Sequence, residues 1–376
     1  MLSAMNTGPK IKKTVIVGMS GGVDSSVTAV LLKQQGFDVI GVFMKNWSED
    51  FGGYGCTWAE DAEDARKVAQ VLKIPFYVWN FEKEYRAKVV DYFLREYRAN
   101  RTPNPDVMCN NEIKFKFFLD KALKLGADFV ATGHYARITK RVSRNAYHLL
   151  KGVDPAKDQS YFLYTLRQKQ LAKILFPIGG YKKSEIRRLA RKFKLPTADK
   201  KDSQGICFIG KINVGEFLRA HIRAKAGDVV TATGEKIGRH SGLPFYTIGQ
   251  RGGIGIGGGG PFYVVGKDLK KNQLVVTNKP ADKNLWRREF SVSDISWTGQ
   301  TPKLPLRAGV TIRYHHPEQK ALIGRIPPRG RAGKNPAKGA ARIKFAKSQR
   351  AITPGQAAVF YKKNELLGGG IIVHVF

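Results

Sequence analysis

Short apolar runs alternate with longer helical patterns through the first half of the chain. The apolar runs are rich in β-branched and aromatic residues, which favours buried strands. They cover residues 14–17, 38–43, 76–80 and 129–132. Apolar residues at helical spacing predict helices between them, over residues 25–35, 58–72 and 85–99. This strand–helix–strand repetition predicts an α/β domain with a doubly wound parallel sheet, which we assign to residues 11–208.

A strongly basic helix is expected near the end of this domain, over residues 184–193. Ser184 is its expected N-cap, and Leu195-Pro196 its expected stop. Beyond residue 208, Gly-rich turns separate short β runs at 227–232, 261–265 and 273–277. We therefore expect a small β-rich central domain over residues 209–284.

Short strands recur towards the C-terminus and predict a β-barrel over residues 285–376. These strands are expected at 290–292, 310–314, 341–345, 357–361 and 370–376. Within this region, residues 323–350 contain nine Lys or Arg and no Asp or Glu, interrupted by Pro and Gly. That composition predicts an exposed basic loop.

The charge of the whole chain points to a polyanionic partner. Lys and Arg total 65 against 30 Asp and Glu, which gives a formal net charge of +35. Such an excess is relieved when phosphates release their counterions on binding, so a nucleic acid is the favoured partner. One alternative is a protein that binds a membrane surface. The other is an organism whose proteins are all basic, in which case the charge says little about partners. For the basic loop, RNA contact is favoured over a solvated hairpin tip without function.

The cysteines and the hydropathy pattern indicate the compartment. The three cysteines are Cys56, Cys109 and Cys207, too far apart in sequence for the disulfide framework of a small secreted protein. No apolar run approaches the roughly 18 residues of a membrane helix, and no signal-peptide pattern precedes the first strand. We expect a cytoplasmic protein without a membrane partner.

The strongest local motif follows the first expected strand and precedes the first expected helix. Its residues are Gly18, Met19, Ser20, Gly21, Gly22, Val23, Asp24 and Ser25. Glycines let the backbone approach a polyphosphate, the serines offer hydroxyls, and the helix N-terminus attracts an anion. Asp24 suits a Mg²⁺ ion that bridges phosphates. The loop is not a Walker loop, because the lysine before Ser or Thr is missing.

Two cysteines lie in motifs of their own. Cys109 ends the run Asn104-Pro105-Asp106-Val107-Met108-Cys109, and Cys207 lies in Gly205-Ile206-Cys207-Phe208. Both appear beside turn-forming residues rather than inside helices, and Asn-Pro-Asp alone would form a turn. A thiolate is a nucleophile and a sulfur carrier. The residues by themselves favour a buried, inert thiol for each over a catalytic one.

The loop from Ser20 to Ser25 resembles the pyrophosphate-binding loop of the ATP pyrophosphatases. Together with the two cysteine motifs, the chain resembles the bacterial tRNA-specific 2-thiouridylases over nearly its whole length. Further matching segments are Gly133-His134-Tyr135, residues 157–163, residues 246–251 and residues 353–356. The resemblance implies an adenine nucleotide α-hydrolase-like first domain and ATP as a substrate, used with Mg²⁺.

The same resemblance implies a reaction and its catalytic residues. ATP would adenylate the C2 oxygen of the wobble uridine of a tRNA, and Cys207 would carry a persulfide received from a sulfur-relay protein. Cys109 would be the second thiol, which either frees sulfide or pairs with Cys207 in a disulfide. Asp106 would be the third catalytic residue. No permanently bound metal or iron–sulfur cluster is expected.

Other positions take expected roles from the resemblance. Met44, beside Phe43, and Gly133 would approach ATP, while Asn104, Pro105 and Asp106 would face the target base. The residues expected to contact tRNA are His134, Lys157, Asp158, Gln159, Arg313, Tyr314 and Gln356. Cys56 lies outside these motifs and is expected to be dispensable. The chain departs from the family in a basic insertion at residues 329–338.

Other functions fit the sequence less well. A GMP synthetase needs an ammonia-supplying partner or domain, and an argininosuccinate synthetase has no use for two thiols. A tRNA 2-thiocytidine enzyme would carry Cys-x-x-Cys pairs for an iron–sulfur cluster, and this chain has none. A non-catalytic RNA-binding protein would not need both the intact loop and the two cysteines.

Overall fold

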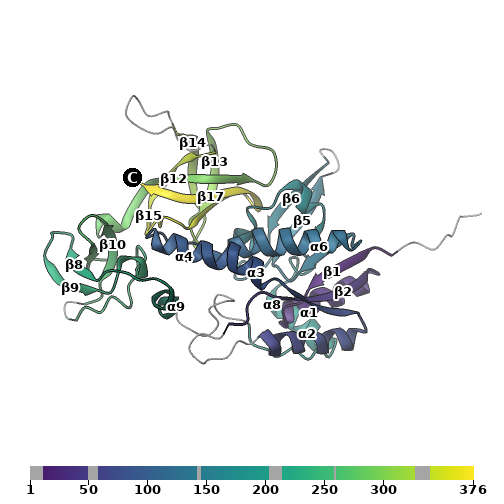
Figure 1. Ribbon diagram of the computed structural model, residues 1–376. Coiled ribbons are helices and arrows are strands. Elements are labelled where there is room, and N and C mark those ends of the chain that lie inside the picture. The colour runs from purple at the N-terminus through teal and green to yellow at the C-terminus, as the bar shows by residue number, and fades with distance from the viewer. Residues whose placement is uncertain (1–11, 50–57, 142–144, 203–213, 258–259, 327–338) are drawn as a thin grey trace, which may run out of the picture.

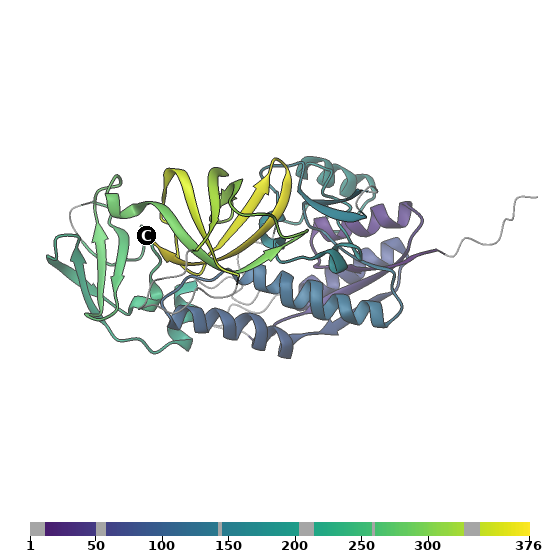
Figure 2. The same ribbon diagram turned by 90° about the horizontal axis from the view of Figure 1, so that it is seen from above.

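A computed structural model describes residues 12–49, 58–141, 145–202, 214–257, 260–326 and 339–376. The molecule is elongated, with the N-terminal sheet at one end, a small sheet at the other and a barrel between them (Figure 1, Figure 2). In the parts of the chain that the structure describes, no helix is both long and apolar enough to cross a membrane.

The N-terminal sheet has five parallel strands in the order β3-β2-β1-β4-β7. Its strands are β1 (Thr14–Gly18), β2 (Asp38–Lys45), β3 (Phe76–Asn80), β4 (Phe129–Thr132) and β7 (Ile174–Leu175). The run Val15, Ile16, Val17 is almost inaccessible to solvent, because β1 is central and covered on both faces. The predicted doubly wound α/β domain is confirmed.

Helices cover both faces of this sheet. One face packs against α1 (Val23–Gln34), α2 (Trp58–Leu72) and α8 (Lys183–Lys192). The other face packs against two helical runs that change pitch along their length. The first comprises α3 (Glu82–Tyr85), η1 (Arg86–Val90) and α4 (Asp91–Arg98), and the second comprises α5 (Pro105–Met108), η2 (Cys109–Phe118) and α6 (Leu119–Lys124). The second run is kinked at Phe115, whose carbonyl accepts a hydrogen bond from Gln170 at 2.6 Å.

The central domain is a four-stranded sheet in the order β10-β11-β8-β9. Its strands are β8 (Gly227–Thr231), β9 (Lys236–His240), β10 (Tyr263–Asp268) and β11 (Gln273–Thr277). Val229, Val264 and Leu274 form part of its separate small core. Short helices flank these sheets: α7 (Gln168–Leu171), α9 (Val214–His221), η4 (Ser160–Leu163), η5 (Leu243–Phe245) and η6 (Lys283–Leu285).

The C-terminal strands form the predicted barrel. Six antiparallel strands follow the order β12-β15-β14-β13-β16-β17, and pairing of β12 with β17 closes the barrel. They are β12 (Trp286–Trp297), β13 (Leu306–Thr311), β14 (Gln319–Arg325), β15 (Ala341–Arg350), β16 (Ala357–Lys362) and β17 (Glu365–Val375). Phe290, Phe345 and Phe360 fill the interior.

A hairpin from the N-terminal half extends the barrel sheet. It consists of β5 (Ala136–Arg141) and β6 (Ala146–Lys151). Strand β6 pairs with β17 through Leu149 with Leu366 and Leu150 with Glu365. Strand β17 therefore joins the parts of the molecule that carry the N-terminal sheet and the barrel.

Four local predictions were wrong. Strand β3 was expected to be buried, but it lies at the edge of the sheet, with Tyr77 55% and Val78 48% exposed. Helix α8 has Lys182, not Ser184, as its N-cap; the Lys182 N–H donates to the Glu185 carboxylate at 2.7 Å. Strand β14 extends into the start of the expected loop over residues 323–350, and β15, expected at 341–345, runs on to the end of that range. Residues 327–338 lie outside the described residues. Cys109 lies within a helical run, because Asn104 begins a helix instead of a free turn.

Candidate active site

The pyrophosphate loop connects β1 to α1 at the carboxyl edge of the N-terminal sheet. Met19 continues from β1 and donates its N–H to the Val42 carbonyl at 2.8 Å. Gly21 has a φ of +73°, and a Cβ there would lie 2.2 Å from the Asp61 carbonyl oxygen. Gly22 is the extended N-cap of α1, and Val23 is its first residue. The backbone therefore needs glycine where it turns into the helix.

Serine hydroxyls hold this loop in shape. The Ser25 Oγ accepts from the Ser20 N–H at 3.1 Å and donates to the Gly22 carbonyl at 3.0 Å. Ser26 donates to the same carbonyl at 2.8 Å. The first amides of a helix have no carbonyl partners within the helix, so the N-terminus of α1 is suited to an anion such as a pyrophosphate.

Met44 and Gly133 both lie against the loop. A Cβ on Gly18 would lie 3.0 Å from the Met44 methyl carbon. A Cβ on Gly133 would lie 2.8 Å from the backbone of Asp24 and Ser25. The structure thus brings together every residue expected to bind ATP, although the binding itself stays a prediction.

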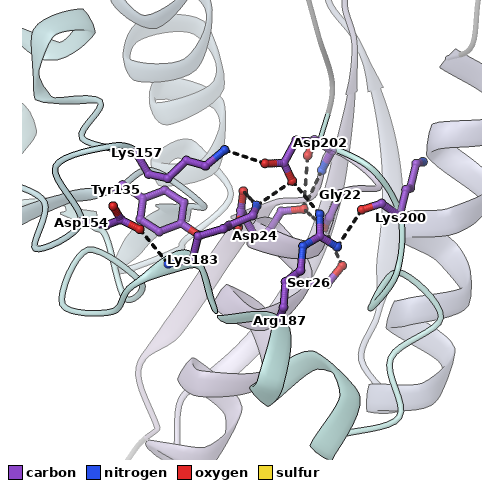
Figure 3. Close-up of polar contacts among 12 residues, drawn as sticks. Gly22, Asp24, Ser26, Tyr135, Asp154, Lys157, Lys183, Arg187, Lys200 and Asp202 are labelled. Atoms are coloured by element: carbon purple, nitrogen blue, oxygen red, sulfur yellow. Dashed lines mark hydrogen bonds and ion pairs between the residues drawn. The ribbon is translucent and has the colours of Figure 1, made fainter. Parts of the chain in front are cut away.

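Asp24 is held by two side chains from distant elements (Figure 3). The Tyr135 hydroxyl donates to one carboxylate oxygen at 2.7 Å, and the Lys183 ammonium lies 2.8 Å from both oxygens. Burial and the neighbouring Asp24 raise the pKa of Tyr135 well above its usual value, so the hydroxyl keeps its proton. Asp24 is thereby oriented beside the first turn of α1.

Lys183 also connects this carboxylate to Asp202. Its ammonium lies 2.8 Å from Asp202, which also receives Lys157 at 2.7 Å and Arg187 at 2.9 Å (Figure 3). Burial acts to raise the pKa of Asp202, but the hydrogen bonds from Lys157 and Lys183 outweigh it and lower the pKa to about 2. Asp202 therefore stays ionised at neutral pH. It is the last described residue before the segment that contains Cys207, and Cys207 and Cys56 both lie outside the described residues.

The second group of expected residues begins the kinked helical run. The Asn104 Oδ1 accepts from the N–H groups of Asp106 and Val107 at 3.1 and 3.2 Å, and Pro105 occupies the first helical position. Burial raises the pKa of Asp106, and the charge of Lys114 opposes this. Cys109 is only 5% exposed. Asp106 and Cys109 thus lie near the capped start of one helix.

Several residues expected to contact tRNA also make internal contacts. His134 is 6% exposed, shares a hydrogen bond with Thr132 at 2.7 Å, and has a pKa that burial lowers well below its usual value. The Gln159 side-chain oxygen accepts from the Tyr135 N–H at 3.0 Å. Asp158 accepts from the Ser160 hydroxyl at 2.9 Å. Their roles in tRNA contact stay predictions.

The barrel supplies the remaining three residues that were expected to contact tRNA. Tyr314 packs against Phe162, with ring centroids 4.4 Å apart, and burial raises its pKa to about 12. Arg313 donates to the Arg350 carbonyl at 3.2 Å. Gln356 donates to the Thr102 carbonyl, two residues before Asn104, at 3.0 Å. The barrel therefore reaches the segment that was expected to face the target base.

The sequence did not single out Lys183 or Asp202, and it gave Tyr135 no individual role. Lys183 is the first residue of α8, and its position in a strongly basic helix hid it among other cations. The available signal for Asp202 was its closeness to the Cys207 motif. Only the fold shows that Lys183 meets Asp24 and links it to Asp202.

The donors near the loop are compatible with Mg²⁺. Among the described residues, no group of three or more His, Cys, Asp or Glu side chains is arranged to hold a metal. Mg²⁺ in nucleotide sites takes one or two carboxylates and completes its shell with phosphates and water. Asp24 meets that requirement, because its side chain is 31% exposed beside the helix N-terminus.

Comparison with known proteins identifies the family. Family models match residues 13–211 (tRNA methyl transferase HUP domain), 215–278 (tRNA methyl transferase PRC-barrel domain) and 287–372 (aminomethyltransferase beta-barrel domain). The chain is 49% identical over 374 residues to the tRNA-specific 2-thiouridylase MnmA of Geobacillus thermodenitrificans, covering 99% of this chain and 97% of the relative. The chain belongs to the tRNA-specific 2-thiouridylase family.

Other members of the 2-thiouridylase family agree. The enzyme of that name from Streptococcus agalactiae serotype III is 53% identical over 367 residues, covering 95% of this chain and 94% of the relative. Among solved structures, a U34-tRNA thiolase NcsA from Methanococcus maripaludis with its [4Fe-4S] cluster has 21% identity and a TM-score of 0.34, covering 53% of this chain and 64% of that chain. That likeness is too low to support an argument about this family member.

Proposed function

We propose that this protein is a tRNA-uridine 2-sulfurtransferase that uses ATP to replace the C2 oxygen of the wobble uridine with sulfur. The observation that carries the proposal is a sequence identity of about 50% to 2-thiouridylases along almost the whole chain. The loop at the N-terminus of α1 supports the use of ATP, because it offers a polyphosphate helix amides, hydroxyls and the Lys183 ammonium.

In the first step, the uridine C2 oxygen attacks the α-phosphorus of ATP, and pyrophosphate leaves. Residues of the loop hold the departing pyrophosphate, and Lys183 offsets its charge. Mg²⁺, when bound at Asp24, would neutralise further phosphate charge. The product is an O-adenylated uridine whose C2 can be attacked, because AMP is a far better leaving group than oxide.

In the second step, the terminal sulfur of a Cys207 persulfide attacks C2, and AMP leaves. Cys109 then attacks the Cys207 sulfur, which leaves 2-thiouridine and a Cys109–Cys207 disulfide that a reductant must reopen. Alternatively, Cys109 attacks first and releases sulfide, which itself attacks C2. Both routes form the same disulfide. Asp106, near Cys109 on the same helix, is the proposed third catalytic residue.

Two partners complete the proposal. A tRNA binds with its target uridine at Asn104, Pro105 and Asp106, and a persulfide relay protein reloads Cys207. The net charge of +35 supports a polyanionic substrate. A cytoplasmic location follows from the proposed substrate. The basic insertion at residues 329–338 is proposed to add phosphate contacts.

The test is to incubate the purified protein with ATP, Mg²⁺, a persulfide donor and unmodified tRNA. The expected result is release of pyrophosphate together with 2-thiouridine, identified by mass spectrometry of the digested tRNA. Cys207→Ser should form no 2-thiouridine, whereas Cys56→Ser, the matched control, should remain active. If the tRNA gains a methyl group, or pyrophosphate is released without sulfur incorporation, the sulfur chemistry proposed here is wrong.

A further inference from the structure

The connection between α4 and α5, residues 99–104, is held from both β-rich parts of the molecule. The Thr102 hydroxyl lies 3.0 Å from the hydroxyl of Thr247 in the central domain. The Thr102 N–H donates to the carbonyl of Pro354 in the barrel at 2.9 Å. The connection is therefore a joint at which the catalytic domain, the central domain and the barrel meet.

Gln356 makes two further bonds from the barrel to this joint. Its Nε2 donates to the carbonyls of Thr102 at 3.0 Å and Pro103 at 3.2 Å. A side-chain amide nitrogen has two hydrogens, so these bonds use both. The expected contact of Gln356 with tRNA would have to use Oε1. The amide nitrogen thus serves the protein's own backbone.

Gly355 allows the barrel loop to come this close. Its φ is +94°, and a Cβ there would lie 2.8 Å from both the backbone N and the carbonyl oxygen of Thr102. The loop is also fixed to the barrel, because Gly355 and Gln356 exchange backbone hydrogen bonds with Ile372 of β17, each at 2.8 Å. The barrel therefore presents Gln356 from a rigid position.

The joint leads directly into the helix that bears the proposed catalytic groups. Asn104 follows Pro103, and its side chain caps the helix on which Asp106 and Cys109 lie. A shift of the Thr102 and Pro103 carbonyls moves the cap and, with it, the start of the helix. Holding these two carbonyls therefore fixes the place of Cys109.

We propose that Gln356 is a positioning residue, which sets the helix start carrying Asp106 and Cys109 through its two bonds to the joint. The proposal rests on the proposed function for its effect on catalysis. The barrel then has a role beyond tRNA contact, because its seating on the joint determines where the second thiol lies.

The first test reads the position of Cys109 without any reaction. In a Cys56→Ser, Cys207→Ser background, iodoacetamide can modify only Cys109, because the chain has three cysteines. Gln356→Glu cannot donate, so it should raise the alkylation rate in the absence of tRNA by roughly thirtyfold, the factor expected from losing two hydrogen bonds of ordinary net strength. Gln356→Met, which loses the donors but keeps the length, should act in the same direction.

The second test separates positioning from tRNA binding in the otherwise wild-type chain. Either Gln356 variant should lower the kcat for 2-thiouridine formation at least fivefold and change the KM for tRNA by less than twofold. The matched control is Gln349→Glu, since the Gln349 Nε2 makes a local bond to the Lys347 carbonyl at 2.8 Å on β15. It should alter neither kcat nor Cys109 alkylation.

If Gln356 serves only to contact tRNA, both tests should give results contrary to those expected above. An unchanged alkylation rate in the Gln356 variants, or a raised KM with unchanged kcat, would overturn the positioning role. The alkylation test needs no turnover, so it remains valid if wild type forms no 2-thiouridine and the proposed function itself fails. Should Gln356→Glu not fold, Gln356→Met decides the matter.

Discussion

Replacing Lys183 with Met removes the cation that bridges the two carboxylates beside the pyrophosphate loop. The Lys183 ammonium lies 2.8 Å from both oxygens of Asp24 and 2.8 Å from Asp202. Methionine has a similar length and no charge, so the variant changes electrostatics more than packing. We expect it to weaken ATP binding.

The size of the effect follows from the charges. Asp24 and Asp202 together with Lys183, Lys157 and Arg187 carry a formal charge of +1, and the variant leaves the cluster neutral next to a polyanionic ligand. A unit charge about 6 Å from a phosphate charge contributes about 3 kcal/mol at an effective dielectric constant of about 20. The Lys183 side chain is 13% exposed, so part of this remains after screening. If half remains, ATP binding weakens roughly tenfold.

Equilibrium dialysis with labelled ATP measures this change directly. Lys183→Arg should keep most of the affinity, because it retains the charge. Arg188→Gln removes one charge from the exposed side of the same helix and should leave the Kd within twofold of wild type. If Lys183→Met binds ATP as tightly as wild type, Lys183 is no part of the nucleotide site, and the reasoning above fails.

Three further predictions concern stability. The folded pKa of Asp202 is about 2, below its unfolded value, so its ion pairs should add about 1–2 kcal/mol to the free energy of unfolding at neutral pH. This contribution is lost as pH falls from about 4 to about 2. The unfolding free energies of wild type and Asp202→Asn, measured in urea, should therefore converge in acid, and a constant difference would refute the reasoning. Gly133→Ala should lower the free energy of unfolding by about 1–3 kcal/mol and weaken ATP binding, since its Cβ would meet the Asp24 backbone. Thermal unfolding measures the first effect and equilibrium dialysis the second, and an unchanged melting temperature would contradict the clash. Asn104→Ala should cost about 1 kcal/mol through the lost cap, whereas Asn104→Asp, which can still accept, should be milder in the same assay.

The sequence predicted those features that depend on neighbouring residues. Strands β1, β2 and β4 and helix α2 follow from local apolar patterns, and the loop at residues 18–25 follows from glycines placed between a strand and a helix. The barrel was also predictable as a class. Strand β14 was missed, because the outward positions Lys320 and Leu322 are exposed and the basic residues that follow suggested a loop.

The missing parts are contacts between distant residues. Lys183 meets Asp24 across 159 positions, and Gln356 meets Thr102 across 254. No local period encodes such pairs. The cap of α8 failed for a different reason: Ser184 has the better side chain for an N-cap, but the Glu185 carboxylate bonds to the backbone of Lys182. Which of two nearby residues becomes the N-cap depends on the local backbone geometry, and the residue types alone do not determine it.

The hairpin of β5 and β6 limits how this protein can be divided. Because β6 pairs with β17, the edge of the barrel sheet is completed by a segment more than two hundred positions earlier in the chain. A fragment that ends after the first domain would carry a hairpin whose partner strand is gone, and the isolated barrel would leave the start of β17, at Glu365 and Leu366, without its β6 partner. Gene fusions, domain exchanges and truncations are therefore tolerated only if the hairpin and the barrel are inherited together.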